Sequence, residues 1–138
     1  MKERNFQTFF SDWIKRNVPQ FTTVFELKLA KGGSLPFKSV KEHQVDALVS
    51  ATSFGVYHKI HDLPVFAGSK THWANKKPFD CFYIKTPESY VVIWFYHSRE
   101  KKEMIWIRIE DWLKEARESD RKSLTEERAR QIGIIYSF

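Results

Sequence analysis

Residues 25–44, with the sequence FELKLAKGGSLPFKSVKEHQ, hold the most informative pattern in this chain. They begin inside a largely apolar run, 21–30, that predicts a β-strand. Side chains alternate between the two faces of a strand, so Glu26 and Lys28 share one face with Val24. A carboxylate and an ammonium group are costly to bury unless they are paired. The pattern therefore predicts either an exposed ion pair on a strand face or a site where the two charges perform chemistry.

The chemical interpretation gives each of these two charges a task. The carboxylate of Glu26 can hold a divalent cation, and the ammonium group of Lys28 can steady or deprotonate a water molecule beside it. Because Glu-x-Lys is a common pattern, the exposed ion pair is the simpler interpretation when the two residues are taken alone. The residues that follow favour the chemical one.

A turn and a helix are predicted directly after the strand. The loop 31–34 leads into LPF at 35–37, and SVKE at 39–42 has the form of a capping box. This pattern predicts a helix over 40–51, in which apolar residues recur at helical spacing. Gln44 falls on the inward face of that helix, where its polar side chain needs a partner.

These features together resemble the RecU-like Holliday junction resolvases of the PD-(D/E)xK nuclease superfamily. That family carries a Glu-x-Lys strand, a polar loop, a Phe-Pro-Leu-like turn and a Glu-His-Gln helix. This chain has ELK at 26–28, LPF at 35–37 and EHQ at 42–44 at very similar spacing. The resemblance implies an α/β fold with a mixed β-sheet flanked by helices, like that of restriction endonucleases. It also implies a Mg²⁺-dependent DNA endonuclease of phage or mobile-element type, with Mn²⁺ as a substitute metal.

The resemblance assigns a role to each candidate site residue. Glu26 would be catalytic and bind the metal, Lys28 would position water or stabilise charge at the phosphate, and Gln44 would hydrogen-bond the phosphate or a metal-bound water. The family's second acid, an aspartate upstream of the Glu-x-Lys, has no counterpart here. Asp80 stands among apolar residues at the start of a later strand, so we expect it to supply that catalytic metal ligand. Alternatively, Asp80 pairs with a nearby lysine or a backbone amide. The reserve candidates are Asp62, Asp12 and Glu3.

The charge of the chain favours a polyanionic partner. The formal net charge is +6 and the pI is near 9.4, which supports association with a polyanion but says nothing about the fold. In the long loop 64–78, basic residues are interleaved with Trp73, a pattern that suits phosphate contact and base stacking. An ordinary solvated loop is the alternative. The candidate DNA contacts are Lys31, Lys38, His43, Lys70, Trp73, Lys76 and Lys77.

The remaining segments predict one α/β domain over residues 1–138. An apolar stripe predicts an amphipathic helix at 2–17. A strand at 54–60 follows the first strand and its helix, an order that predicts a parallel pair of strands. The next three strands resemble an antiparallel meander, and the middle one, YVVIWFY at 90–96, is apolar enough to be buried on both faces. These three strands span 78–84, 90–96 and 103–109, and they precede helices at 110–117 and 125–131 and a strand at 132–138.

Several classes of protein are disfavoured by the composition. The single cysteine, Cys81, excludes an intramolecular disulfide and a multi-cysteine zinc site, and it fits the reducing cytoplasm. No apolar run approaches the roughly 18 residues that a membrane span needs. A four-way DNA junction has near two-fold symmetry, so the resemblance implies a homodimer. Two other functions stay open: a non-catalytic DNA-binding module on a nuclease-like fold, and a protein-interaction domain.

Overall fold

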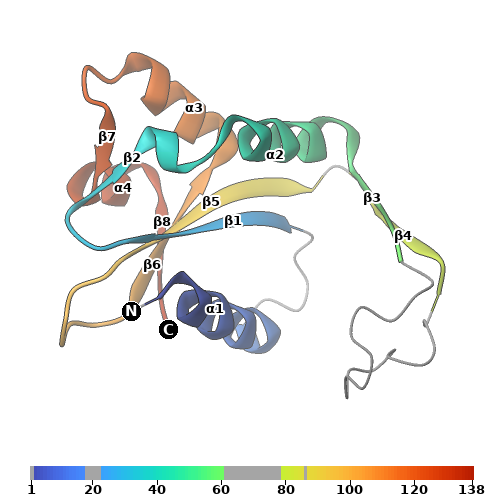
Figure 1. Ribbon diagram of the computed structural model, residues 1–138, viewed down its shortest axis with the longest axis horizontal. Coiled ribbons are helices and arrows are strands. Elements are labelled where there is room, and N and C mark those ends of the chain that lie inside the picture. The colour runs from blue at the N-terminus through green and yellow to red at the C-terminus, as the bar shows by residue number, and fades with distance from the viewer. Residues whose placement is uncertain (1, 18–22, 61–78, 86) are drawn as a thin grey trace.

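A mixed four-stranded sheet forms the centre of the structure, a computed structural model that describes residues 2–17, 23–60, 79–85 and 87–138. The strand order is β1-β5-β6-β8. The strands β1 and β5 run parallel, whereas β5 pairs with β6, and β6 with β8, in antiparallel fashion (Figure 1). The strand bounds are β1 (Thr23–Ala30), β5 (Glu88–Phe95), β6 (Glu103–Arg108) and β8 (Ile134–Ser137).

Helices cover both faces of this sheet. On one face α1 buries Phe6 and Phe10 against the aromatic side of the strands. On the other face a second core joins the sheet to the remaining helices, of which α2 and α3 lie above it in Figure 1. The prediction of a mixed α/β fold is therefore confirmed. The helix bounds are α1 (Glu3–Asn17), α2 (Glu42–Phe54), α3 (Ile109–Glu118) and α4 (Glu126–Ile132).

The strand β5 is the buried axis of the sheet, as its apolar sequence predicted. It lies between β1 and β6, and Val91, Val92 and Ile93 have no exposed surface. Odd-numbered side chains such as Val91 enter the core shared with α2, and even-numbered ones such as Val92 enter the core shared with α1. A strand covered on both faces has no place for a polar face, which explains the continuous apolar run.

The predicted pairing of the strands was wrong in two respects. The strand after α2, β3 (Val56–Lys59), does not join β1. It pairs antiparallel with β4 (Cys81–Ile84) in a separate two-stranded sheet. The parallel partner of β1 is β5. The predicted three-stranded antiparallel meander lacks its first strand, because β4 does not pair with β5. Because β3 exposes most of its side chains, it cannot fill the doubly covered position beside β1.

The loop after β1 is held by a short pairing that the sequence did not predict. Its strand β2 (Ser34–Pro36) pairs antiparallel with β7 (Ser123–Thr125). A 3₁₀ turn, η1 (Phe37–Ser39), follows, and α2 begins two residues later than the predicted start at residue 40. The N-cap of α2 is Lys41, so the predicted cap at Ser39 was wrong. The N-cap of α4 is Thr125, whose side chain accepts a hydrogen bond from the backbone N–H of Arg128.

Candidate functional site

The strand β1 places Glu26 and Lys28 on the face of the sheet that α2 covers. Their neighbour Val24 packs against the core on that side, while Phe25 and Leu27 pack toward α1. The Lys28 Nζ atom lies 2.9 Å from Glu26 Oε1, and the two side chains are only 13% and 23% exposed. The pair is therefore a partly buried one, and not the exposed surface pair that the simpler interpretation expected.

Gln44 joins this pair from α2, in the inward orientation predicted for it. Its Nε2 donates a hydrogen bond to Glu26 Oε1 over 2.7 Å. Its Oε1 accepts from Lys28 Nζ at 3.3 Å and from the backbone N–H of Lys41 at 2.9 Å. In this orientation the amide nitrogen faces a carboxylate acceptor and the amide oxygen faces two N–H donors. The amide thereby links the N-terminus of α2 to the two charges on β1.

The turn between β1 and α2 fixes where Gln44 lies. Leu35 and Val40 are buried, with exposed fractions of 4% and 5%. Between them the ring of Phe37 packs edge-on against Trp112 of α3, with ring centroids 5.3 Å apart. Three anchors within six residues leave the first turn of α2 little freedom. The turn at 35–40, which we call the brace, therefore holds the first turn of α2, and with it Gln44, in a fixed position beside β1.

The cluster of Glu26, Lys28 and Gln44 offers a limited but specific chemistry. An ammonium group and an amide stand beside a carboxylate whose two contacts to them are made by Oε1. Mg²⁺ is commonly held by one or two carboxylates together with waters and substrate phosphates. Glu26 fits as one such ligand. Within the described ranges, no three His, Cys, Asp or Glu side chains gather as a metal site.

Asp80 is not brought to this cluster by the described sheet pairings. It precedes β4 and is exposed, and its carbonyl oxygen accepts a hydrogen bond from Ile60 N. The β3–β4 ribbon that carries it is separate from the sheet that carries Glu26. In Figure 1 the ribbon extends outward from the sheet.

The other predicted positions fall into three groups. Glu3 and Asp12 are exposed on α1, which covers the opposite face from Glu26, so that helix does not bring them to the site. Lys31, Lys38 and His43 are exposed along the segment that includes the brace and the start of α2. The remaining candidates lie outside the described residues: Asp62, Lys70, Trp73, Lys76 and Lys77.

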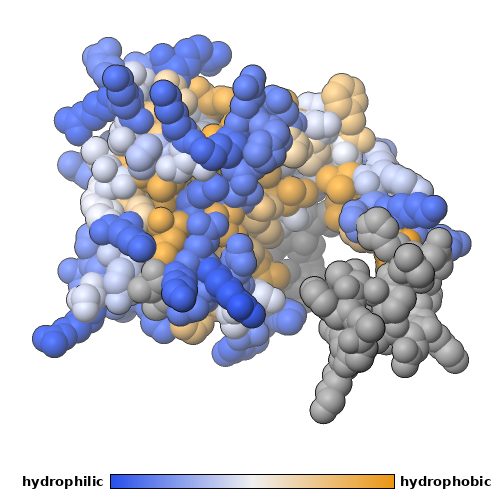
Figure 2. All heavy atoms as spheres, in the orientation of Figure 1, coloured by the Kyte–Doolittle hydropathy of each residue, from blue (hydrophilic) through white to orange (hydrophobic). Residues whose placement is uncertain are grey.

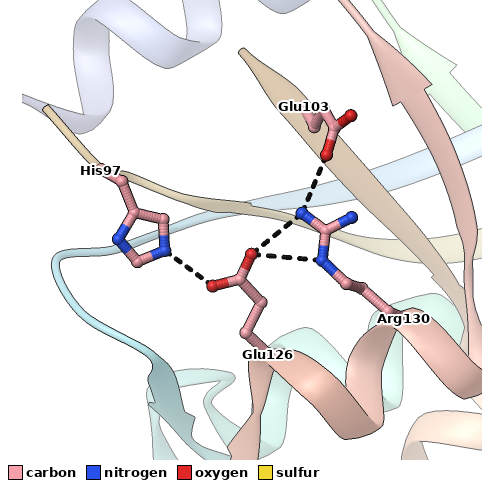
Figure 3. A network of polar contacts seen from close by, with 4 residues as sticks. All are labelled: His97, Glu103, Glu126 and Arg130. Atoms are coloured by element: carbon pink, nitrogen blue, oxygen red, sulfur yellow. Dashed lines mark hydrogen bonds and ion pairs between the residues drawn. The ribbon is translucent and has the colours of Figure 1, made fainter. Parts of the chain in front are cut away.

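A second polar cluster was missed by the sequence reasoning. His97 Nε2 lies 2.7 Å from Glu126 Oε2 (Figure 3). Arg130 bridges Glu126 to Glu103, and its Nη2 atom lies 2.8 Å from Glu103 Oε2. The cluster joins the turn after β5 to β6 and α4. Glu126 and Arg130 stand four residues apart in α4. Opposite charges at this spacing lie next to each other on a helix, so the sequence alone could have predicted this ion pair. His97 and Glu103 come from other elements, and no local pattern connects them.

This cluster shifts the protonation of its members. The hydrogen bond to Glu126 is the main cause that raises the pKa of His97. Burial acts to raise the pKa of Glu126, but hydrogen bonds from His97 and Arg130 outweigh it, so the net pKa is lowered. Arg130 and the neighbouring Arg128, which pairs with Glu115, are thus engaged within the fold.

Comparison with family models, with curated proteins and with solved structures gave no match. The helices in the described part of the chain are all too short or too polar to cross a membrane.

Proposed function

We propose that this protein is a metal-dependent DNA endonuclease, resembling the RecU-like Holliday junction resolvases and acting on branched DNA. The observation that supports it best is the convergence of Glu26, Lys28 and Gln44 in one partly buried cluster. These residues come from the strand and the helix that carry the resemblance.

Each residue would have one task in phosphodiester hydrolysis. Glu26 would hold Mg²⁺ together with the carboxylate of Asp80, and the metal would supply charge neutralisation and an acidified water when bound. The ammonium group of Lys28 would stabilise negative charge that develops on the phosphate oxygens. Gln44 would orient Lys28 and Glu26 and, with its amide, hydrogen-bond the scissile phosphate. The core would then be of the PD-(D/E)xK kind.

The basic surface supports DNA as the substrate. Lys31, Lys38 and His43 are exposed on the chain segments that flank the cluster, and the whole chain carries a net charge of +6. Such charges attract a phosphate backbone without reading its sequence. A homodimer would match the two-fold symmetry of a four-way junction.

The decisive experiment replaces Glu26 by Gln, which retains the shape of the side chain and removes its charge. We expect cleavage of branched DNA in Mg²⁺ or Mn²⁺ to fall about 100-fold or more, while DNA binding persists. The matched control is Glu110→Gln, an exposed acid in the first turn of α3, which should cleave normally. Urea unfolding of both variants verifies that they are folded. Unchanged cleavage by a folded Glu26→Gln protein would rule the mechanism out.

A non-catalytic DNA-binding module is the second candidate. The position of Asp80 on a separate ribbon favours it, because the described cluster contains one carboxylate. Salt-dependent DNA binding by the wild-type protein, with no nicking in either metal, would support this candidate over the nuclease. DNA affinity that is absent or independent of salt would instead indicate a protein-interaction domain.

A further inference from the structure

The turn that joins β5 to β6, residues 97–102 with the sequence HSREKK, is rich in positive charge. Arg99, Lys101 and Lys102 are exposed there, and Glu100 is the acid among them. Within the described part of the chain, Arg99 and Lys101 form no ion pair, whereas the arginines of β6 and α4 are each bound by a glutamate. This segment, which we call the basic turn, therefore carries cationic groups that the fold does not use.

Arg99 holds a backbone conformation that its side chain makes unfavourable. Its φ is +68°, and no other residue with a side chain in the described ranges has a positive φ. Glycine reaches this left-handed region readily, whereas a Cβ atom crowds the backbone there. Strained residues of this kind gather where a protein binds a ligand. The guanidinium group of Arg99 is thus a candidate contact for a bound molecule.

Both ends of the basic turn are fixed to the body of the protein. At its start, His97 Nε2 lies 2.7 Å from Glu126 Oε2 of α4 (Figure 3). At its end, the carbonyl oxygen of Lys102 accepts a hydrogen bond from Phe138 N over 3.0 Å. The Nζ atom of Lys102 also lies 4.3 Å from the centre of the Phe9 ring on α1. The cations at the tip are therefore held in place before a ligand arrives, which lowers the entropic cost of binding.

Two acids near the base of the basic turn are already paired. Glu126 accepts hydrogen bonds from His97 and Arg130, and Glu103 accepts one from Arg130. Their negative charge is compensated within this cluster. The hydrogen bond to Glu126 also raises the pKa of His97, so a larger share of the imidazole is cationic near neutral pH. This edge of the molecule consequently presents positive charge to the solvent.

The basic turn lies beside the loop that follows β1. Ala30 pairs with Phe95, and Tyr96 N donates to the carbonyl oxygen of Ala30 over 2.8 Å, so β5 leaves the sheet next to Lys31. Both segments lie on the left side of Figure 1, and Figure 2 shows hydrophilic residues at the lower left, where the tip of the turn lies. Lys28 stands roughly 10 Å before Lys31 along the strand, a length that covers about three phosphates of one DNA strand.

We propose that the basic turn is a clamp for the phosphate backbone of DNA, in which Arg99 and Lys101 each contact a phosphate. The guanidinium fork of an arginine fits a phosphate with two hydrogen bonds, and a lysine acts as a point charge. Such contacts do not read base edges, so they act alike on branched and linear DNA. This inference rests on the proposed function for DNA as the partner, but it is measured by binding, without cleavage.

Removing the two charges at the tip tests the clamp. Arg99→Gly/Lys101→Ala loses both cations, and glycine accepts the positive φ of residue 99, so the variant should unfold at no lower urea concentration than the wild-type protein. We expect the salt dependence of the association constant on logarithmic axes to lose about 2 units of slope. Fluorescence anisotropy with a labelled duplex and a labelled four-way junction, in EDTA, measures it. Arg99→Lys/Lys101→Arg keeps both charges and should keep most of the wild-type slope.

A matched control separates contact from overall charge. Lys114→Ala/Arg117→Ala removes one lysine and one arginine from exposed positions on α3, and its slope should stay close to that of the wild-type protein. A wild-type slope in Arg99→Gly/Lys101→Ala would overturn the clamp, and so would an equal loss in both double variants. A selective loss in a protein that never nicks DNA would support the clamp and refute the endonuclease. A wild-type protein that binds no DNA would overturn both.

Discussion

At the scale of single residues, Gln44 shows how one amide can organise two charges. It satisfies Glu26 and Lys28 together, and a third hydrogen bond anchors it to the backbone of Lys41. Partly buried charges are costly when one partner is missing. The amide therefore serves both the stability of the strand and the geometry that catalysis would need.

His97 gives the stability of the protein a predictable dependence on pH. Its pKa is raised above the usual 6.5, chiefly by the hydrogen bond to Glu126. A raised pKa stabilises the fold fully below the unfolded value, and this contribution is lost as the pH rises through the folded value. The pKa of Glu126 is lowered below 4.5, so its contribution is present above that pH and is lost in more acidic solution. The pair therefore contributes most between these two values.

Replacing His97 by Gln checks this expectation. The difference in urea midpoint between the wild-type protein and His97→Gln should be larger near about pH 5.5 than near about pH 9. The control His43→Gln alters an exposed histidine of α2 that is not part of the Glu126 cluster, and it should change the urea midpoint only slightly. A His97→Gln difference that is constant over this range would show that the charged contact adds nothing to stability.

At the scale of elements, the end of α2 depends on Gly55. In Gly55→Ala the new methyl group would meet the carbonyl oxygen of Ile84 and the ring of Tyr83 at under 3 Å, and the backbone would retain an unfavourable φ. We expect a loss of at least about 1–2 kcal/mol in the free energy of unfolding, measured by urea titration. Gly32→Ala is the control, because nothing lies within 4 Å of its added methyl group. Equal stability of the two variants would contradict the observed backbone at Gly55.

The positions of helices and strands along the chain were predicted better than the pairing between strands. The periodicity of α1, the apolar run of β5 and the alternation of β1 were each sufficient to identify a helix or a strand. The pairing of β3 was mispredicted because strand order along the chain was used as a guide to neighbours in space. The correct neighbour of β1 begins more than 60 residues later in the sequence than Thr23. The strand β5 takes this place because its side chains can be buried on both faces of the sheet. That requirement is a property of the assembled sheet.

At the scale of the whole molecule, the positive charge predicts salt-dependent binding to DNA. The observed association constant should fall linearly with salt concentration on logarithmic axes, with a slope of about 0.9 for each phosphate neutralised. If Lys31 and Lys38 both contact phosphates, the double variant Lys31→Ala/Lys38→Ala should reduce the slope by about 2. Fluorescence anisotropy with a labelled four-way junction measures both quantities.

A matched double variant separates local contact from overall charge. Lys15→Ala/Lys114→Ala removes the same number of charges from exposed positions on α1 and α3. We expect its slope to stay close to that of the wild-type protein. The same reduction in both double variants would show that the DNA responds to net charge and that the segments flanking Glu26 do not form the interface.

The sequence by itself determined the α/β class, the face that Glu26 and Lys28 share, and the inward direction of Gln44. These properties follow from side-chain periodicity within one strand or helix, and neighbouring residues are enough to reveal them. Only the tertiary structure decided that β5 lies beside β1, that Asp80 is carried on an outward ribbon, and that His97 meets Glu126. Such contacts join segments far apart in the chain, and they form because burial of the whole core favours them, a free energy that no short stretch of sequence contains.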